Sequence, residues 1–133
     1  MKLTNTERND LIEMTDRDSV QAFIDGEWND TKYEIRTTEQ ATQAVYDMYR
    51  GDEYMLGAFN ASFLQDYICL DAETIETLQK SEAYEGIGKA IMNSGNFEEM
   101  MDDYIQADGF GAALGSYDGN YEEYNDLIIV RMK

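Results

Sequence analysis

The chain has 133 residues and a mass of 15.3 kDa, which is the size of one domain. Its 28 acidic residues outnumber 10 basic ones, the formal net charge is −18, and histidine is absent. This charge excludes direct binding to nucleic acid or to an anionic membrane, and the lack of histidine excludes Ser-His-Asp, Cys-His and imidazole-zinc sites.

The first elements predicted along the chain are two short helices. Thr6 is a suitable N-cap for a helix over Glu7–Met14. Asp16 or Asp18 can start a second helix, which Gly26 is expected to end. Charged residues within the first eight positions interrupt the apolar run that a signal peptide needs, so we expect a soluble cytoplasmic protein.

The middle of the chain is predicted to be helical after one strand. Tyr33–Arg36 alternates as a short strand does, and Thr37 begins a capping box for a helix that runs to about Arg50. Gly51 would close that helix in a left-handed conformation. The most apolar stretch, Tyr54–Leu70, is the candidate for a central buried helix.

Three further helices follow in the sequence pattern. Asp71 and Ser81 each begin one, and two glycines in the second, Gly86 and Gly88, indicate that another backbone packs closely there. Asn93–Asn96 is a stop signal, after which Asn96 would cap the next helix.

The last part of the chain is predicted to form a β-hairpin. Its strands would be Phe110–Tyr117 and Leu127–Met132, and the loop between them would hold Tyr121–Tyr124. The strand at Tyr33–Arg36 would make the sheet three-stranded and antiparallel. The expected fold is therefore a single α+β domain over residues 1–133, mostly helical, with a C-terminal β-hairpin.

Carboxylates gather in the last third of the chain without any counter-charge. Between Ala90 and Val130 there is no lysine or arginine, and nine acids occur: Glu98, Glu99, Asp102, Asp103, Asp108, Asp118, Glu122, Glu123 and Asp126. The first four would lie on one face of a helix, where each like-charged pair costs a few tenths of a kcal/mol. Such repulsion suggests that the negative surface has a use.

Three alternatives compete for these acids. They could be ordinary solvated helix faces, or two of them could form a glycosidase-like pair. They could also bind Ca²⁺, although Gly119 follows Asp118 directly, whereas an EF-hand loop has its glycine at the sixth position. We expect no enzyme activity, no metal site and no cofactor. The single cysteine, Cys69, excludes an internal disulfide and is expected to be buried.

Imitation of DNA is the use that fits the charge pattern. Residues four apart on a helix are about 6 Å apart along its axis, and eighteen charges match on the order of 30 Å of duplex at one charge per 1.7 Å. The nine acids are the predicted contact surface. Tyr121 and Tyr124, with Tyr104 and Tyr117, are candidate aromatic anchors, of which at least half are expected to pack internally.

The composition resembles that of small acidic inhibitors encoded by phages and mobile elements. These are the anti-restriction and anti-CRISPR proteins that act as DNA mimics. The closing segment is similar in its residue pattern to the end of small acidic phage and plasmid proteins. It runs from Asp108-Gly109-Phe110-Gly111 to Leu127-Ile128-Ile129-Val130-Arg131. The resemblance implies a stoichiometric inhibitor whose partner is a basic nucleic-acid-binding protein, either a Cas effector or a restriction-modification enzyme.

The sequence leaves two alternatives open, one about the oligomeric state and one about the function. A homodimer would double the length of such a mimic. The alternative function is an acidic protein-interaction module, such as an antitoxin or a regulator, that binds a basic partner without copying DNA.

Overall fold

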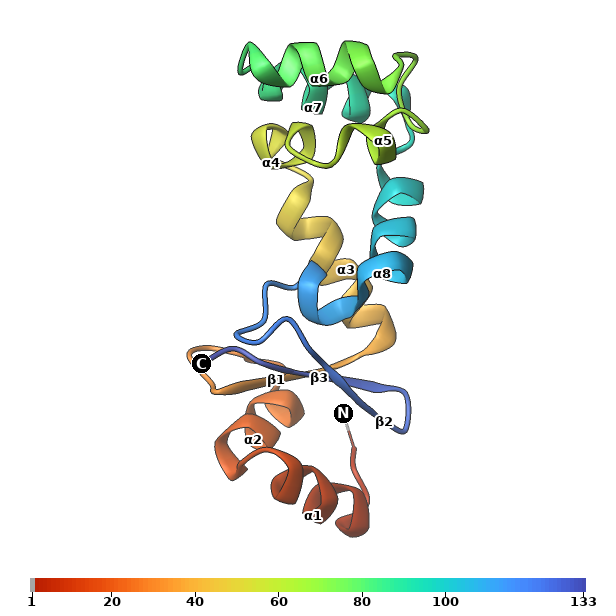
Figure 1. Ribbon diagram of the computed structural model, residues 1–133. Coiled ribbons are helices and arrows are strands. Elements are labelled where there is room, and N and C mark those ends of the chain that lie inside the picture. The colour runs from red at the N-terminus through yellow and green to blue at the C-terminus, as the bar shows by residue number, and fades with distance from the viewer. Residues whose placement is uncertain (1) are drawn as a thin grey trace. The chain divides into compact units, whose positions relative to one another are not determined.

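The computed structural model describes residues 2–133 and contains, in that range, eight helices and one three-stranded antiparallel sheet (Figure 1). The elements in chain order are α1 (Asn5–Met14), α2 (Arg17–Asp25), β1 (Tyr33–Thr37), α3 (Thr38–Tyr49), α4 (Glu53–Gly57), α5 (Ala61–Leu64), α6 (Ala72–Lys80), α7 (Tyr84–Ser94), α8 (Phe97–Ala113), β2 (Glu122–Tyr124) and β3 (Leu127–Arg131). The predicted class, a mostly helical α+β fold with a C-terminal hairpin, is confirmed.

The chain divides into two compact units. Unit 1 contains the chain up to Gln43 together with Ile105–Lys133, and unit 2 contains Ala44–Tyr104. The expectation of a single domain stays a prediction. No helix among the described residues is long and apolar enough to cross a membrane.

The sheet of unit 1 has the strand order β1-β3-β2, with β3 in the centre. Tyr33 pairs with Arg131, and Ile129 lies between Ile35 on one side and Glu122 on the other. Four successive residues of β3, Leu127–Val130, are buried, as expected of a central strand covered on both faces.

The hairpin is present, but its first strand is not where the sequence placed it. Asn125 and Asp126 both have positive φ, 45° and 65°, and form the two-residue turn between β2 and β3. The strand is therefore Glu122–Tyr124, which was predicted to be loop, and Phe110–Ala113 belongs to α8. Gly111 explains the difference, because only a residue without a Cβ lets α8 approach the backbone of Gly119 and Asn120.

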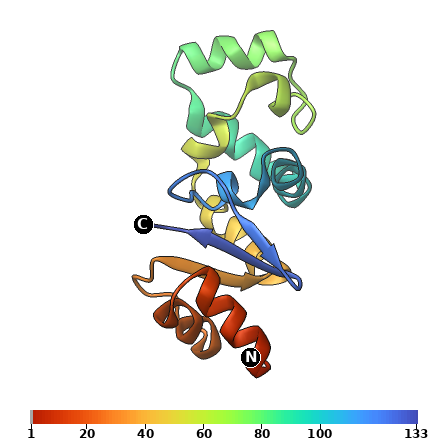
Figure 2. The ribbon, with the colours of Figure 1, turned by 60° about the horizontal axis from the view of Figure 1, so that its bottom comes forward.

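Helices α1 and α2 cover one face of the sheet (Figures 1 and 2). Their buried side chains and those of the strands form one core cluster: Leu11, Val20, Phe23, Ile35, Leu127 and Ile129. The cap of α1 is a Thr4–Glu7 capping box, so the helix begins two residues earlier than predicted. Asp16 caps α2 and Gly26 ends it with φ 74°, as predicted.

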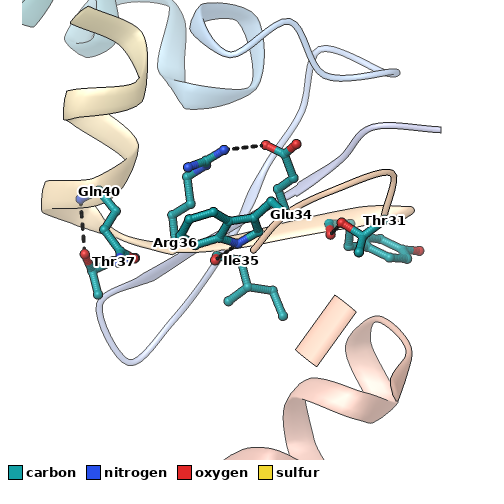
Figure 3. Close-up of polar contacts among 8 residues, drawn as sticks. Thr31, Glu34, Ile35, Arg36, Thr37 and Gln40 are labelled. Atoms are coloured by element: carbon teal, nitrogen blue, oxygen red, sulfur yellow. Dashed lines mark hydrogen bonds and ion pairs between the residues drawn. The ribbon is translucent and has the colours of Figure 1, made fainter. Parts of the chain in front are cut away.

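A tryptophan that precedes β1 packs against an arginine of that strand. The indole N–H of Trp28 donates to the carbonyl of Ile35 at 2.7 Å, and the Arg36 guanidinium lies 4.4 Å from the Trp28 ring centroid. Arg36 also forms an ion pair with Glu34 at 2.8 Å (Figure 3). The predicted capping box at the start of α3 is confirmed by hydrogen bonds in both directions between Thr37 and Gln40 (Figure 3).

Unit 2 contains no long central helix. The stretch Tyr54–Leu70 forms α4, α5 and turns, because Asp52 and Asn60 cap two separate short helices. Gly51 has no positive φ, so the expected left-handed cap is also wrong. Helices α6, with its Asp71 cap, and α7 lie close to the predicted positions, although α7 begins at Tyr84 rather than near Ser81.

Helices α4 and α7 pack with their backbones in close contact. A Cβ on Gly88 of α7 would overlap the backbone of Glu53, and a Cβ on Gly57 of α4 would overlap the backbone of Tyr84. The predicted close approach is confirmed at Gly88, whereas Gly86 faces open space. Two glycines thus set the distance between these helices.

We predict that Gly88→Ala lowers the free energy of unfolding by more than about 2 kcal/mol, because the backbones of α4 and α7 must separate. Gly86→Ala is the matched control in the same helix. It should be neutral or stabilising by up to about 1 kcal/mol, since alanine favours the helix. Urea unfolding of both variants measures the difference, and equal effects would refute the proposed contact.

Candidate partner-binding surface

The first half of α8 presents four of the predicted contact acids. Glu98, Glu99 and Asp102 are exposed and Asp103 is half-buried, whereas Phe97, Met100 and Met101 on the opposite side of the helix are buried. The side-chain amide of Asn96, the residue before this helix, donates to the Tyr67 carbonyl at 3.0 Å, and its backbone N–H donates to the Ser94 hydroxyl at 3.1 Å. These bonds tie the start of α8 to other segments of unit 2.

Two tyrosine hydroxyls hold successive aspartates of this helix. Tyr46 of α3 donates to Asp102 at 2.5 Å, and Tyr67 donates to Asp103. The hydrogen bond to Asp102, followed by burial, raises the pKa of Tyr46 to about 12. Burial, followed by the hydrogen bond to Asp103, raises the pKa of Tyr67 as well. The two carboxylates are therefore held in place by uncharged hydroxyl donors.

The other five predicted acids lie in unit 1. Asp108 precedes Gly109, where α8 is kinked by a non-helical backbone (φ 84°, ψ 165°). Asp118 lies in the loop before β2 and accepts a hydrogen bond from the Asn120 amide at 3.0 Å. Glu122 and Glu123 belong to β2, and Asp126 to the hairpin turn. The nine acids are thus distributed over both units, four on α8 in unit 2 and five in unit 1.

Within residues 2–133 these acids form no ion pair with a lysine or arginine. The ion pairs within residues 2–133 are Arg36 with Glu34, Arg50 with Asp47, and Lys133 with Asp30. None of the nine acids takes part in one, and eight of them are exposed. Unit 2 is the more strongly charged for its size, with thirteen acids and three basic residues, a net charge of −10.

The four candidate tyrosines divide evenly between packing and exposure. Tyr104 is half-buried against Phe59, with ring centroids 4.8 Å apart, and the Tyr124 hydroxyl donates to Asp10 at 2.7 Å. Tyr117 is 70% exposed, and Tyr121 is 38% exposed. Tyr117 and Tyr121 therefore stay accessible to a partner.

A cavity opens beside the hairpin in unit 1. It has a volume of about 320 Å³ and is lined by three of the predicted contact residues, Asp118, Tyr121 and Glu122. Met14, Tyr33 and Arg131 also line it. These three come from α1, β1 and β3, and no local sequence pattern would bring them together.

An aromatic patch lies on unit 2 and was not predicted. Its hollow, about 230 Å³, is lined by the rings of Tyr49, Phe59 and Tyr104 and by Met55, which is 40% exposed. The sequence missed it because Tyr54–Leu70 was interpreted as one buried helix. Interfaces between proteins are enriched in tyrosine and methionine, so this patch is a second candidate contact.

The described residues offer no group of three or more side chains arranged to hold a metal ion. Cys69 is exposed, which corrects the expectation of a buried thiol.

The chain matches no protein-family model, no curated protein and no solved structure. The candidate surface therefore rests on its own geometry and charge.

The tyrosine hydroxyls lead to a prediction about alkaline pH. A tyrosine whose pKa is raised in the folded state contributes stability that is complete below the unfolded value of about 10 and is lost as pH rises toward the folded value. The pKa of Tyr46 and that of Tyr124 are both raised to about 12. The free energy of unfolding should therefore fall between pH 10 and pH 12.

Tyr46→Phe tests the origin of this fall. The variant should lose about 1 kcal/mol at pH 8 through the missing hydrogen bond, and its stability should depend less steeply on pH above 10. Tyr54→Phe is the control, because the Tyr54 hydroxyl has no hydrogen bond within the described chain and is 56% exposed. A Tyr46→Phe curve that parallels the wild-type curve would contradict the assignment.

Proposed function

We propose that the protein is a stoichiometric inhibitor that occupies the DNA- or RNA-binding channel of a bacterial defence protein, either a Cas effector or a restriction-modification enzyme. The observation that carries the proposal is the set of nine carboxylates between Glu98 and Asp126, none of which is neutralised by a basic residue of the described chain. A channel lined with lysine and arginine would supply the missing counter-charge.

The fixed positions of the α8 acids support this proposal. Glu98 and Asp102, like Glu99 and Asp103, are four residues apart and so about 6 Å apart along the helix axis. Tyr46 and Tyr67 already order two of the carboxylates, so little side-chain entropy remains to be lost on binding. The acids act as preorganised substitutes for backbone phosphates.

One observation favours a second candidate, an acidic interaction module that does not copy DNA. Unit 2 exposes three large hydrophobic side chains, Met48, Tyr54 and Met55, which are 43%, 56% and 40% accessible, and Met55 also lines the aromatic patch. The phosphate backbone of a duplex has no comparable apolar group. An antitoxin or regulator would use such a patch as the core of its interface and the acids as the rim.

Competition with nucleic acid separates the two functions. The immobilised protein should capture a nucleic-acid-binding protein from a bacterial lysate, and a short DNA duplex or guide RNA should release it at constant ionic strength. Elution buffer of the same ionic strength without nucleic acid is the control. If the captured protein binds the duplex and this chain together, direct mimicry is wrong and the interaction module is favoured.

Charge reversals locate the contact once the partner is captured. Glu99→Lys should weaken binding about two- to fivefold, because the energy is spread over many contacts, and a second reversal at Asp108 should weaken it by a similar factor. Glu13→Lys is matched in charge, exposure and helical setting, and should have a smaller effect. A larger effect of Glu13→Lys would place the contact at the N-terminal helices.

A further inference from the structure

The cavity beside the hairpin lies on the face of the sheet that α1 and α2 cover. Because Tyr33 pairs with Arg131 and Glu122 pairs with Ile129, these four side chains share one face. Helix α1 ends at Met14, which lines the cavity. The cavity is thus the part of this face beyond the end of α1, enclosed on another side by the loop at Asp118–Tyr121.

One wall of the cavity is an immobilised aromatic ring. Tyr121 packs edge-on against Phe110, with ring centroids 5.8 Å apart and an interplanar angle of 88°. Its ring also lies against Gly109, where an added Cβ would come within 2.8 Å of it. Tyr33 lines the cavity as well. The Lys32 ammonium lies 5.7 Å from the Tyr33 ring centroid, so Tyr121 is the ring that is available to stack on a planar cation.

The two carboxylates that line the cavity form no ion pair with any described residue. Asp118 and Glu122 line it together with Arg131, yet no ion pair joins the arginine to either carboxylate in the described residues. Arg131 is held elsewhere: its Nε donates to the Lys133 carbonyl at 2.7 Å, and its guanidinium lies 5.1 Å from the Tyr117 ring centroid. Both carboxylates remain free to accept a cation from outside.

We propose that this cavity binds a single arginine side chain of the partner protein. The guanidinium would stack on Tyr121 and donate to Asp118 and Glu122, and its aliphatic stem would contact Met14. A volume of about 320 Å³ is at the lower end of the range for ligand sites and suits one side chain better than a larger ligand. The inference rests on the proposed function for the source of the arginine.

The test uses the full chain and a defined probe, N-acetyl-arginine amide, added to ¹⁵N-labelled protein and followed by NMR. Saturable shifts are expected at the amides of Asn120, Tyr121 and Ile129, which line the cavity. The isosteric citrulline derivative, which has no charge, should cause none. The same pattern for both probes, or no saturable shift with arginine, would overturn the proposal.

Two neighbouring glutamates provide a matched pair of variants. Glu122 lines the cavity, whereas Glu123 pairs with Ile128 and points to the other face of the sheet. Glu122→Gln should weaken arginine binding about tenfold. Asp118→Asn should also weaken it, although the asparagine side-chain oxygen can still accept the hydrogen bond from the Asn120 amide. Glu123→Gln should leave binding unchanged. Equal weakening by Glu122→Gln and Glu123→Gln would mean that arginine only follows the overall negative charge.

The test of the arginine site and the test of the proposed function can fail independently of each other. Arginine can bind the cavity even where the duplex fails to release the captured partner, in which case only the mimicry is wrong. Release by duplex without arginine binding in the cavity would leave the inhibitor role intact and remove this site.

Discussion

Uncompensated negative charge is the constraint on which the rest of this structure depends. With 28 acids and 10 basic residues, the fold cannot neutralise its carboxylates internally. No aspartate or glutamate is buried among the described residues, and three aspartates, Asp10, Asp102 and Asp103, accept hydrogen bonds from tyrosine hydroxyls instead of pairing with cations. A hydroxyl donor orders a carboxylate without cancelling its charge. The folded protein therefore keeps an ordered, strongly negative surface, and a basic partner gains from meeting it.

Local sequence signals predicted the parts of the fold that local interactions determine. The Asp16 and Asp71 caps, the Thr37–Gln40 capping box and the left-handed Gly26 each involve residues within a few positions of one another, so they could be identified without the structure. The failures come from contacts between distant residues. Tyr54–Leu70 looked like one helix because its apolar side chains are dense, but Gly57 packs on Tyr84 and the stretch breaks into short helices. Phe110–Tyr117 looked extended because of its small residues, which instead let α8 approach the loop before β2.

The candidate surface was predictable in composition and not in arrangement. The exposure of the nine acids follows from their charge, and all but Asp103 are exposed as expected. Their division between two units does not follow, since it depends on where the chain folds back. Tyr46 and Tyr67 meet α8 from 56 and 36 residues away, and no local pattern marks such a pair. The same holds for the cavity, where the register of the sheet pairs Tyr33 with Arg131 and places Glu122, two strands away from Tyr33, on the same face.

The salt dependence of binding tests the central claim most directly. If the carboxylates replace phosphates in a basic channel, the captured partner should lose affinity for this protein by at least about tenfold between 50 and 200 mM salt, since six to ten phosphate contacts in a true duplex cost on the order of 10³- to 10⁵-fold over that range. The partner's affinity for duplex should fall in parallel when both are measured in the same buffers. An affinity for this protein that does not change with salt would show that the acids are not the contact, and would contradict the account.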